Sequence, residues 1–334
     1  MKKYLPLLTL LFLFACEKDP QVLTDEALLV IPKGFPDITF PADNELTPER
    51  WNLGKRLFFD PILSNDKSIS CASCHHPDLA FTDGLSLSKG VGSRIGSRNA
   101  PSLANVAYHP YLTREGGVPT LEMQILVPIQ EHAEFDFNIL LIADRMKEDS
   151  TYVRASREAY GRDPDPFVIT RAISSFERTI ISGDSRYDRF INDDRGSLSV
   201  DEQRGRDLFF SERLACSACH GGFNFTNYAF ENNGLYPDYN DPGRFRVTGV
   251  ESDRALFKVP SLRNVDITSP YMHDGSIATL QEVVEHYNSG GRNHPHKNNL
   301  IKPLYLTAIE KADLVAFLRT LTDQSFLTDE KFRN

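Results

Sequence analysis

Apolar residues recur at the three- and four-residue spacing of an amphipathic helix in two stretches of the chain. They are Ile169, Ala172, Ile173, Phe176 and Ile180 in the first stretch, and Ile309, Leu314, Phe317, Leu318 and Leu321 in the second. The first pattern predicts a helix over residues 167–191, and the second predicts a helix that begins after Thr307. No segment of consequence has the composition of a strand, so the pattern predicts a mostly α-helical protein.

The pattern also repeats between the two halves of the chain. Residues 54–59 and 205–210 both read G-x-x-L-F-F, with an apolar edge suited to packing on a flat apolar group. Each segment follows a Thr or Ser with acidic residues after it, Thr47 and Ser199, which is typical of a helix N-cap. The simplest explanation is two related domains.

Each half also contains the pentapeptide C-x-x-C-H. The motif residues are Cys71, Cys74 and His75 in the first half, and Cys216, Cys219 and His220 in the second. This spacing is typical of covalent attachment of haem c, in which two thiols form thioethers and the histidine ligates iron. The alternatives are a disulfide or a zinc site, but zinc would need a second Cys or His pair close to each motif. The repeat therefore predicts two cytochrome c-type helical domains, each carrying one covalent haem.

Length and composition indicate how the chain is divided. A chain of 334 residues is long enough for about two domains. We predict a signal peptide over residues 1–15, a lipid-anchored tether over 16–44, an N-terminal domain over 45–192 and a C-terminal domain over 193–334. Segments rich in Gly, Pro and Asn separate the helices, which predicts long loops that cover the haems.

The N-terminus has the features of an export signal. Lys2 and Lys3 precede an apolar run from Leu7 to Ala15, which is too short to span a bilayer as a mature helix. Residues 13–16 resemble a lipoprotein box, which predicts cleavage and lipidation at Cys16; the alternative is an ordinary signal peptide with a bystander cysteine. A diacylated Cys16 would anchor the protein to a cell-envelope membrane on the periplasmic side.

The charge of the mature chain is acidic. Loss of Lys2 and Lys3 with the signal peptide changes the net charge from −9 to −11. An acidic surface argues against a nucleic-acid partner. It is compatible with electrostatic steering of a basic redox partner.

Four further strings make the chain resemble the bacterial di-haem cytochrome c peroxidases and their MauG-like relatives. They are residues 57–61, 98–103, 260–264 and 270–275. The resemblance runs from about residue 35 to residue 321, nearly the whole mature chain. It implies a peroxidatic N-terminal haem and a C-terminal haem that relays electrons from a partner.

We therefore predict a cytochrome c peroxidase that reduces hydrogen peroxide to water with electrons from a small cytochrome c or cupredoxin. A MauG-like oxidase acting on a protein or organic substrate is the alternative enzyme. A di-haem electron carrier is the non-enzymatic alternative. Relatives are often dimers, which makes a homodimer a further expectation.

The resemblance also implies two catalytic residues. In the family, a glutamine and a glutamate lie ten residues apart after a G-x-x-x-x-L-E segment, and Gln124 and Glu134 follow residues 116–122 in this way. Glu134 would move the proton during peroxide cleavage as general acid–base catalyst, while Gln124 would position peroxide or water. The plain alternative is two exposed helix residues, and the nearby His132 is a rival for the role.

The chain departs from the better-known peroxidases at the N-terminal haem. Those enzymes carry a distal histidine eight residues before the asparagine of R-N-x-P, and that position is Val91, eight residues before Asn99. Valine cannot ligate iron, so we expect this haem to be open in the resting oxidised protein, without reductive activation.

At the C-terminal haem, the resemblance implies a second ligand fourteen residues after His273, which is Tyr287. A tyrosinate would lower the reduction potential relative to a thioether ligand and stabilise higher iron oxidation states. Met272 is the rival, because methionine is the commoner partner of haem c. We expect His273 to lie near the haems without ligating iron.

Relatives place a tryptophan between the haems, and that position is Arg114 here. An arginine cannot host a hole as indole can, so electrons would take another or a slower path; Arg114 could instead pair with a haem propionate. The family also binds calcium between the haems. Its expected ligands are the Asn99 side chain and the backbone carbonyls of Thr268 and Pro270. Asn99 could equally be a turn residue.

Overall fold

The structure, a computed structural model, describes residues 28–334. The predicted signal peptide and Cys16 lie outside these residues. Within 28–334, no helix combines the length and the apolar character that a membrane crossing requires.

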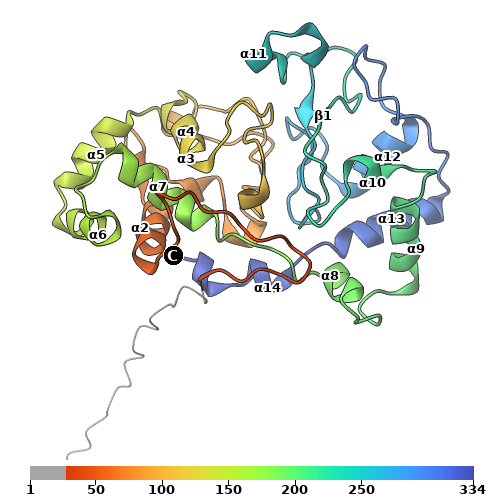
Figure 1. Cartoon of the computed structure of the whole chain (residues 1–334). Helices are drawn as coiled ribbons and strands as arrows, with labels where there is room; N and C mark the ends of the chain where they lie inside the picture. Colours follow the sequence, from red (N-terminus) through yellow and green to blue (C-terminus); the bar gives the residue numbers. More distant parts are fainter. Residues whose placement is uncertain (1–27) are drawn as a thin grey trace, which may run out of the picture.

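The described chain is mostly helical, as the sequence predicts. The helices are α2 (Pro48–Phe59), α3 (Leu121–Gln124), α4 (Leu126–Gln130), α5 (Ile139–Lys147), α6 (Ser150–Tyr160), α7 (Pro166–Glu177), α8 (Arg186–Ile191), α9 (Val200–Phe209), α10 (Cys216–Cys219), α11 (Phe245–Thr248), α12 (Leu280–Ser289), α13 (Ala308–Arg319) and α14 (Gln324–Leu327). Two short strands, β1 (Phe230–Glu231) and β2 (Phe257–Lys258), pair in antiparallel register. Figure 1 shows two lobes, an N-terminal lobe with α2–α7 and a C-terminal lobe with α9–α13.

One close helix crossing organises each lobe, and a glycine makes each crossing possible. A Cβ atom on Gly54 of α2 would lie 1.9 Å from the carbonyl oxygen of Ala172 on α7. A Cβ on Gly205 of α9 would lie 1.9 Å from that of Asp313 on α13. The glycine of each G-x-x-L-F-F repeat therefore lets two backbones touch.

The predicted N-caps are confirmed, but the predicted helix over 167–191 is wrong in extent. Thr47, Ser199 and Thr307 cap α2, α9 and α13 with their side-chain oxygens. Helix α7 ends at Glu177, and the chain runs without helix to α8. The backbone N–H groups of residues 182–184 donate to the side chains of Asn105 and Asp323 instead of continuing a helix.

Residues 28–44, which we expected to be a tether, lie against the folded body. Leu28 is fully buried in the N-terminal core, and Phe35 packs on Phe223 with ring centroids 4.7 Å apart. The Asn44 side chain is buried and donates to Glu122 Oε1 at 3.1 Å. These apolar and hydrogen-bonded contacts hold the segment in place, so a free tether does not extend to residue 44.

Each half of the chain contributes aromatic side chains to the core of the other lobe. The N-terminal core contains Phe58, Phe81 and Phe176, together with Phe326 and Phe332 from the end of the chain. Figure 1 accordingly shows α14 beneath the N-terminal lobe. In the other direction, α8 contributes an aromatic side chain to the C-terminal core. The predicted division at 192/193 stays a prediction, and packing crosses it in both directions.

Candidate active site

The first C-x-x-C-H motif lies on a short helical turn against α2. His75 Nδ1 lies 2.8 Å from the backbone oxygen of Phe81, a donor–acceptor contact that fixes the imidazole ring. A histidine that donates from Nδ1 keeps Nε2 free for a metal, which is the usual arrangement of ligating histidines. Cys71 and Cys74 lie one helical turn away from each other. These residues fit a covalently attached haem.

The second motif repeats this geometry. Its cysteines lie on α10, and His220 Nδ1 lies 3.2 Å from the backbone oxygen of Phe225. A cavity of about 410 Å³ opens in front of the motif, and its walls are mostly apolar. Cys216, Cys219 and His220 line it together with both candidate second ligands, Tyr287 and Met272. The residues again fit a haem held on one face by the motif.

Glu134 lies near the first motif, in the segment after α4. Burial raises the pKa of Glu134 to about 7, and repulsion from Glu131 adds to the shift. Burial raises the pKa of the Cys71 thiol, to which the charge of Glu134 contributes, and Glu134 contributes in the same way at Cys74. The Glu134 carboxyl is therefore a partly buried, titratable group within electrostatic range of both thiols.

The neighbouring His132 has a different environment. Its side chain is 73% exposed, and Nδ1 lies 3.1 Å from Asp136 Oδ1. An exposed imidazole tied to a surface carboxylate is a surface feature. It is therefore a weaker candidate than Glu134.

Gln124 ends α3 with an unsatisfied polar atom. Its side chain lines the 410 Å³ cavity, and its Oε1 is buried without a hydrogen-bond partner in the protein. A buried acceptor without a partner is costly, so it indicates a position where a ligand or water supplies the hydrogen bond. The structure thus places Gln124 at the cavity that the second motif lines, whereas Cys71, Cys74 and His75 do not line it.

Val91 lies in a buried turn next to Glu134. Its backbone N–H donates to the Glu134 carbonyl at 2.9 Å, and its side chain is 6% exposed. A Cβ on Gly90 would lie 2.2 Å from the carbonyl oxygen of Ala133, so the turn sits tightly on the Glu134 segment. The side chain at the expected distal position is apolar and supplies no ligand atom.

Tyr287 and Met272 approach the second motif from different elements. Burial raises the pKa of Tyr287 on α12 to about 12, while Asn233 hydrogen-bonds to it and acts in the opposite direction. The Asn233 amide also donates to the Met272 sulfur at 3.1 Å. Because both side chains line the same cavity, the choice between them stays open.

Arg114 makes a compact set of hydrogen bonds with Asn99. Its guanidinium donates to the Asn99 backbone oxygen at 2.8 and 3.2 Å and to Asn99 Oδ1 at 2.9 Å. Burial lowers the pKa of Arg114 to about 10, which leaves it charged at neutral pH. The Asn99 amide donates to Leu85, which fixes Oδ1 toward Arg114.

These contacts do not fit the expected calcium ion. Asn99, Thr268 and Pro270 do line one cavity, but so does Arg114. A calcium ion about 2.5 Å from Asn99 Oδ1 would lie within about 5.5 Å of the guanidinium. The repulsion amounts to ~6 kcal/mol at an effective dielectric constant of 20, and ~1.5 kcal/mol even at that of water. Within residues 28–334, no three His, Cys, Asp or Glu side chains are grouped for a metal ion.

Two polar residues near the motifs, Glu177 and His109, were not predicted from the sequence. Burial raises the pKa of Glu177, at the end of α7, to about 8, and its charge acts on Cys71. An acidic residue four positions after Ile173 on the apolar face of a helix was the available signal. His109 lines the 410 Å³ cavity with a buried, unpartnered Nε2, and burial lowers its pKa to about 3. No sequence pattern marked His109.

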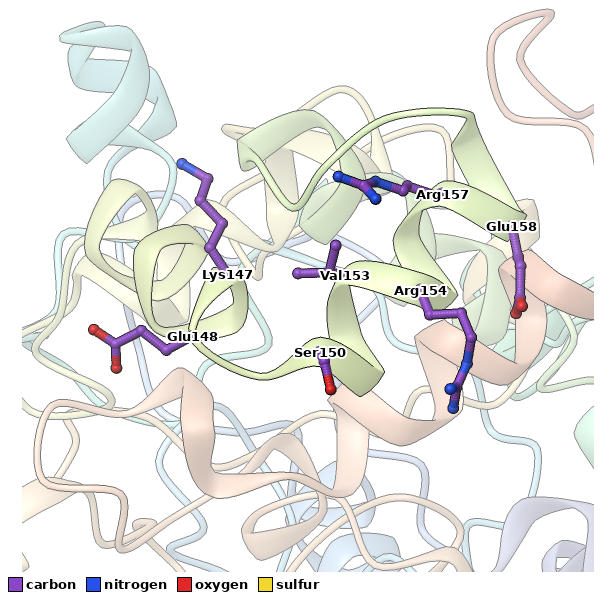
Figure 2. A pocket seen from close by; sticks show the side chains of 7 residues that line it. All are labelled: Lys147, Glu148, Ser150, Val153, Arg154, Arg157 and Glu158. Carbon is purple, nitrogen blue, oxygen red and sulfur yellow. The ribbon is translucent and has the colours of Figure 1, made fainter.

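A second hollow, of about 590 Å³, lies on the outer face of the N-terminal lobe between α5 and α6. Figure 2 shows that charged side chains such as Lys147, Arg154 and Glu158 surround it. No residue of either motif lines this hollow. It is therefore separate from the candidate active site.

Comparison with known proteins agrees with the two-motif architecture. Residues 48–196 match the family described as di-haem cytochrome c peroxidase. The methylamine utilization protein MauG of Methylorubrum extorquens is 38% identical over 289 residues, which covers 85% of this chain and 81% of that protein. The cytochrome c551 peroxidase of Pseudomonas aeruginosa is 31% identical and covers 84% of each chain.

Solved structures give the same result. A MauG-like protein associated with microbial copper homeostasis superposes with a TM-score of 0.84 at 38% identity, over 90% of this chain and 97% of that one. The di-haem peroxidase BthA of Burkholderia thailandensis superposes with a TM-score of 0.74 at 25% identity, over 85% and 88%. The chain therefore belongs to the family of bacterial di-haem cytochrome c peroxidases and their MauG relatives.

Proposed function

We propose that the protein reduces hydrogen peroxide to water at the N-terminal motif, with Glu134 as the proton-transfer group. The observation that carries the proposal is a partly buried Glu134 carboxyl with a pKa raised to about 7, close enough for its charge to act on both motif thiols. A group that both takes and returns a proton works best when its pKa lies near the working pH.

The side chains have distinct tasks in this mechanism. A haem bound at the motif would supply the iron that accepts peroxide and the electrons that cleave its O–O bond. The Glu134 carboxylate takes the proton from the inner peroxide oxygen and returns it to the outer oxygen, which leaves as water. Gln124 offers its buried Oε1 as hydrogen-bond acceptor to peroxide or water. The apolar Val91 has no side-chain atom that could ligate an iron bound at this motif.

Electrons would enter through the second motif. We propose that a small cytochrome c or a cupredoxin donates them, and that Cys216, Cys219 and His220 would hold the haem that supplies the relay. A MauG-like oxidase is the second candidate function, and ligation by Tyr287 rather than by Met272, both of which line the cavity in front of the second motif, would favour it. A steady-state assay with peroxide and reduced cytochrome c separates the two, since only a peroxidase turns over with these substrates alone.

The variant Glu134→Gln tests the proton-transfer role. We expect peroxide turnover to fall by about 10²-fold or more, because no other group returns the proton, with both haem spectra unchanged. His132→Ala is the control, since this exposed side chain lies two residues away, and it should retain activity. Unchanged turnover in Glu134→Gln would remove Glu134 from the mechanism.

Val91 carries a prediction for the resting oxidised protein. With an apolar residue at the distal position, one haem should be high-spin and the other low-spin in the electron paramagnetic resonance spectrum. A pure electron carrier would instead show two low-spin haems. Two low-spin signals with nitrogen ligands on both sides of each iron would contradict an open N-terminal haem.

Several features remain proposals from the sequence. We propose export to the periplasmic side, with lipidated Cys16 as membrane anchor, and a homodimer as the functional form. The family resemblance also predicts a calcium ion, but we do not propose one for this protein. The contacts between Arg114 and Asn99 count against it.

A further inference from the structure

We propose that the Arg114 guanidinium, bound to Asn99 at the seam between the two lobes, takes the place of a bound divalent metal. The protein would then need no calcium for folding or for electron transfer between its haems. The proposal concerns the seam between the lobes, so it stands whether or not Glu134 is the proton-transfer group.

The first support is the way the guanidinium occupies Asn99. It donates two hydrogen bonds to the backbone oxygen and one to Oδ1, so both oxygens of Asn99 are engaged. Oxygen atoms are the ligands that calcium requires. A planar, permanently charged fork of N–H donors satisfies the same oxygens without a metal.

The second support is the position of this pair at the seam. Asn99 donates its backbone N–H to the oxygen of His273 at 2.9 Å, and the backbone oxygen of Arg114 accepts from Lys258 at 2.7 Å. Both partners belong to the C-terminal lobe. The Arg114–Asn99 pair therefore ties two loops of one lobe to two segments of the other.

The third support is the charge around Arg114. Among residues 28–334, no carboxylate hydrogen-bonds to its guanidinium, whose bonds all go to Asn99. The nearest strong pairs are made by another arginine, because Arg98 binds Asp241 through two bonds of 2.6 and 2.9 Å and also binds Glu115. Arg98 thus engages two of the carboxylates whose charge acts on Arg114. The other, Asp274, accepts a hydrogen bond from the Tyr236 hydroxyl at 2.6 Å.

The test uses the full-length protein with both haems attached, and Ca²⁺ alone as the probe. Wild type, Arg114→Lys and Arg114→Gln are treated with a chelator, freed of it and titrated with calcium chloride. Bound calcium per haem iron and the thermal midpoint are measured. Arg213→Gln is the charge-matched control, because this half-exposed arginine pairs with Glu310 far from the seam.

Wild type, Arg114→Lys and Arg213→Gln should retain no stoichiometric calcium, and neither chelator nor calcium should shift their thermal midpoints. Arg114→Gln should bind one ion per chain, at least about tenfold tighter than wild type, with a higher thermal midpoint when calcium is present. One calcium per wild-type chain, with a midpoint that falls in chelator, would overturn the proposal. So would a folded Arg114→Gln protein that binds calcium no better than Arg213→Gln. The wild-type measurement decides the matter even if Arg114→Gln does not fold.

Discussion

At the scale of single residues, burial gives one carboxyl a pKa suited to catalysis. The pKa of Glu134 is raised to about 7, so the carboxylate that takes the peroxide proton forms only as the pH passes that value. The kcat/KM for peroxide should therefore rise between about pH 6 and pH 8 and then level off. A steady-state pH profile checks this. His132→Ala should keep the same midpoint, and a wild-type profile flat through pH 7 would contradict the assignment.

The burial of Glu177 should affect how the stability of the protein depends on pH. Its pKa is about 8 in the folded protein and near 4.5 in an unfolded chain, so the folded state holds the proton more tightly. The stability that this provides is complete below pH 4.5 and is lost as the pH rises through 8. Glu177→Gln should thus raise the free energy of unfolding by roughly 2–5 kcal/mol at pH 9 and little at pH 4. Denaturant unfolding of both proteins at pH 4 and pH 9 provides the measurement. Equal changes in unfolding free energy at the two pH values would show that the buried charge of Glu177 is not the cause.

Sequence spacing identified the candidate catalytic pair but not the environments that surround it. Gln124 and Glu134 follow a motif that can be counted along the chain. The pairing of Arg114 with Asn99 depends on how two loops meet, and no spacing rule describes it. The raised pKa of Glu177 depends on which atoms exclude water from it, and only packing determines that.

At the scale of elements, the two G-x-x-L-F-F helices depend on their glycines for close helix contact. Gly54→Ala or Gly205→Ala would place a methyl group 1.9 Å from a carbonyl oxygen of the partner helix. Forcing the helices apart should cost about 1–3 kcal/mol or more. Thermal melts of the holoproteins test this. Gly196→Ala is the control, because its nearest neighbour would lie 3.6 Å away, and it should change stability by no more than about 1 kcal/mol.

The sequence predicted the start of each major helix more reliably than its end. Thr307 and Ser199 cap their helices by local hydrogen bonds, which local sequence can reveal. The end of α7 is different, because the apolar spacing continues past Glu177 to Ile180. The chain leaves the helix there because Asn105 and Asp323, distant in sequence, accept its backbone N–H groups. Such long-range partners override a local pattern.

At the scale of the whole molecule, the two lobes should unfold as one unit. The end of the chain completes the N-terminal core, since Phe326 and Phe332 pack on Phe81 with ring centroids 5.8 Å apart. In the other direction, Tyr187 packs on Phe225 and Phe317 of the C-terminal core. Unfolding of one lobe would remove these aromatic contacts and expose apolar surface in the other lobe. Calorimetry of the holoprotein should therefore show a single transition, and two separate transitions would contradict the coupling.

Phe332 links the packing between the lobes to the first C-x-x-C-H motif. It packs on Phe81, whose backbone oxygen orients the His75 ring. Phe332→Ala should cost about 3–5 kcal/mol, because the ring is 1% exposed. It should also perturb the spectrum of the N-terminal haem more than that of the C-terminal haem, although the residue lies over a hundred positions after the second motif. Phe210→Ala, at a ring 42% exposed, is the control and should leave the N-terminal haem unchanged. A perturbation confined to the C-terminal haem in Phe332→Ala would show that the tail does not act through Phe81.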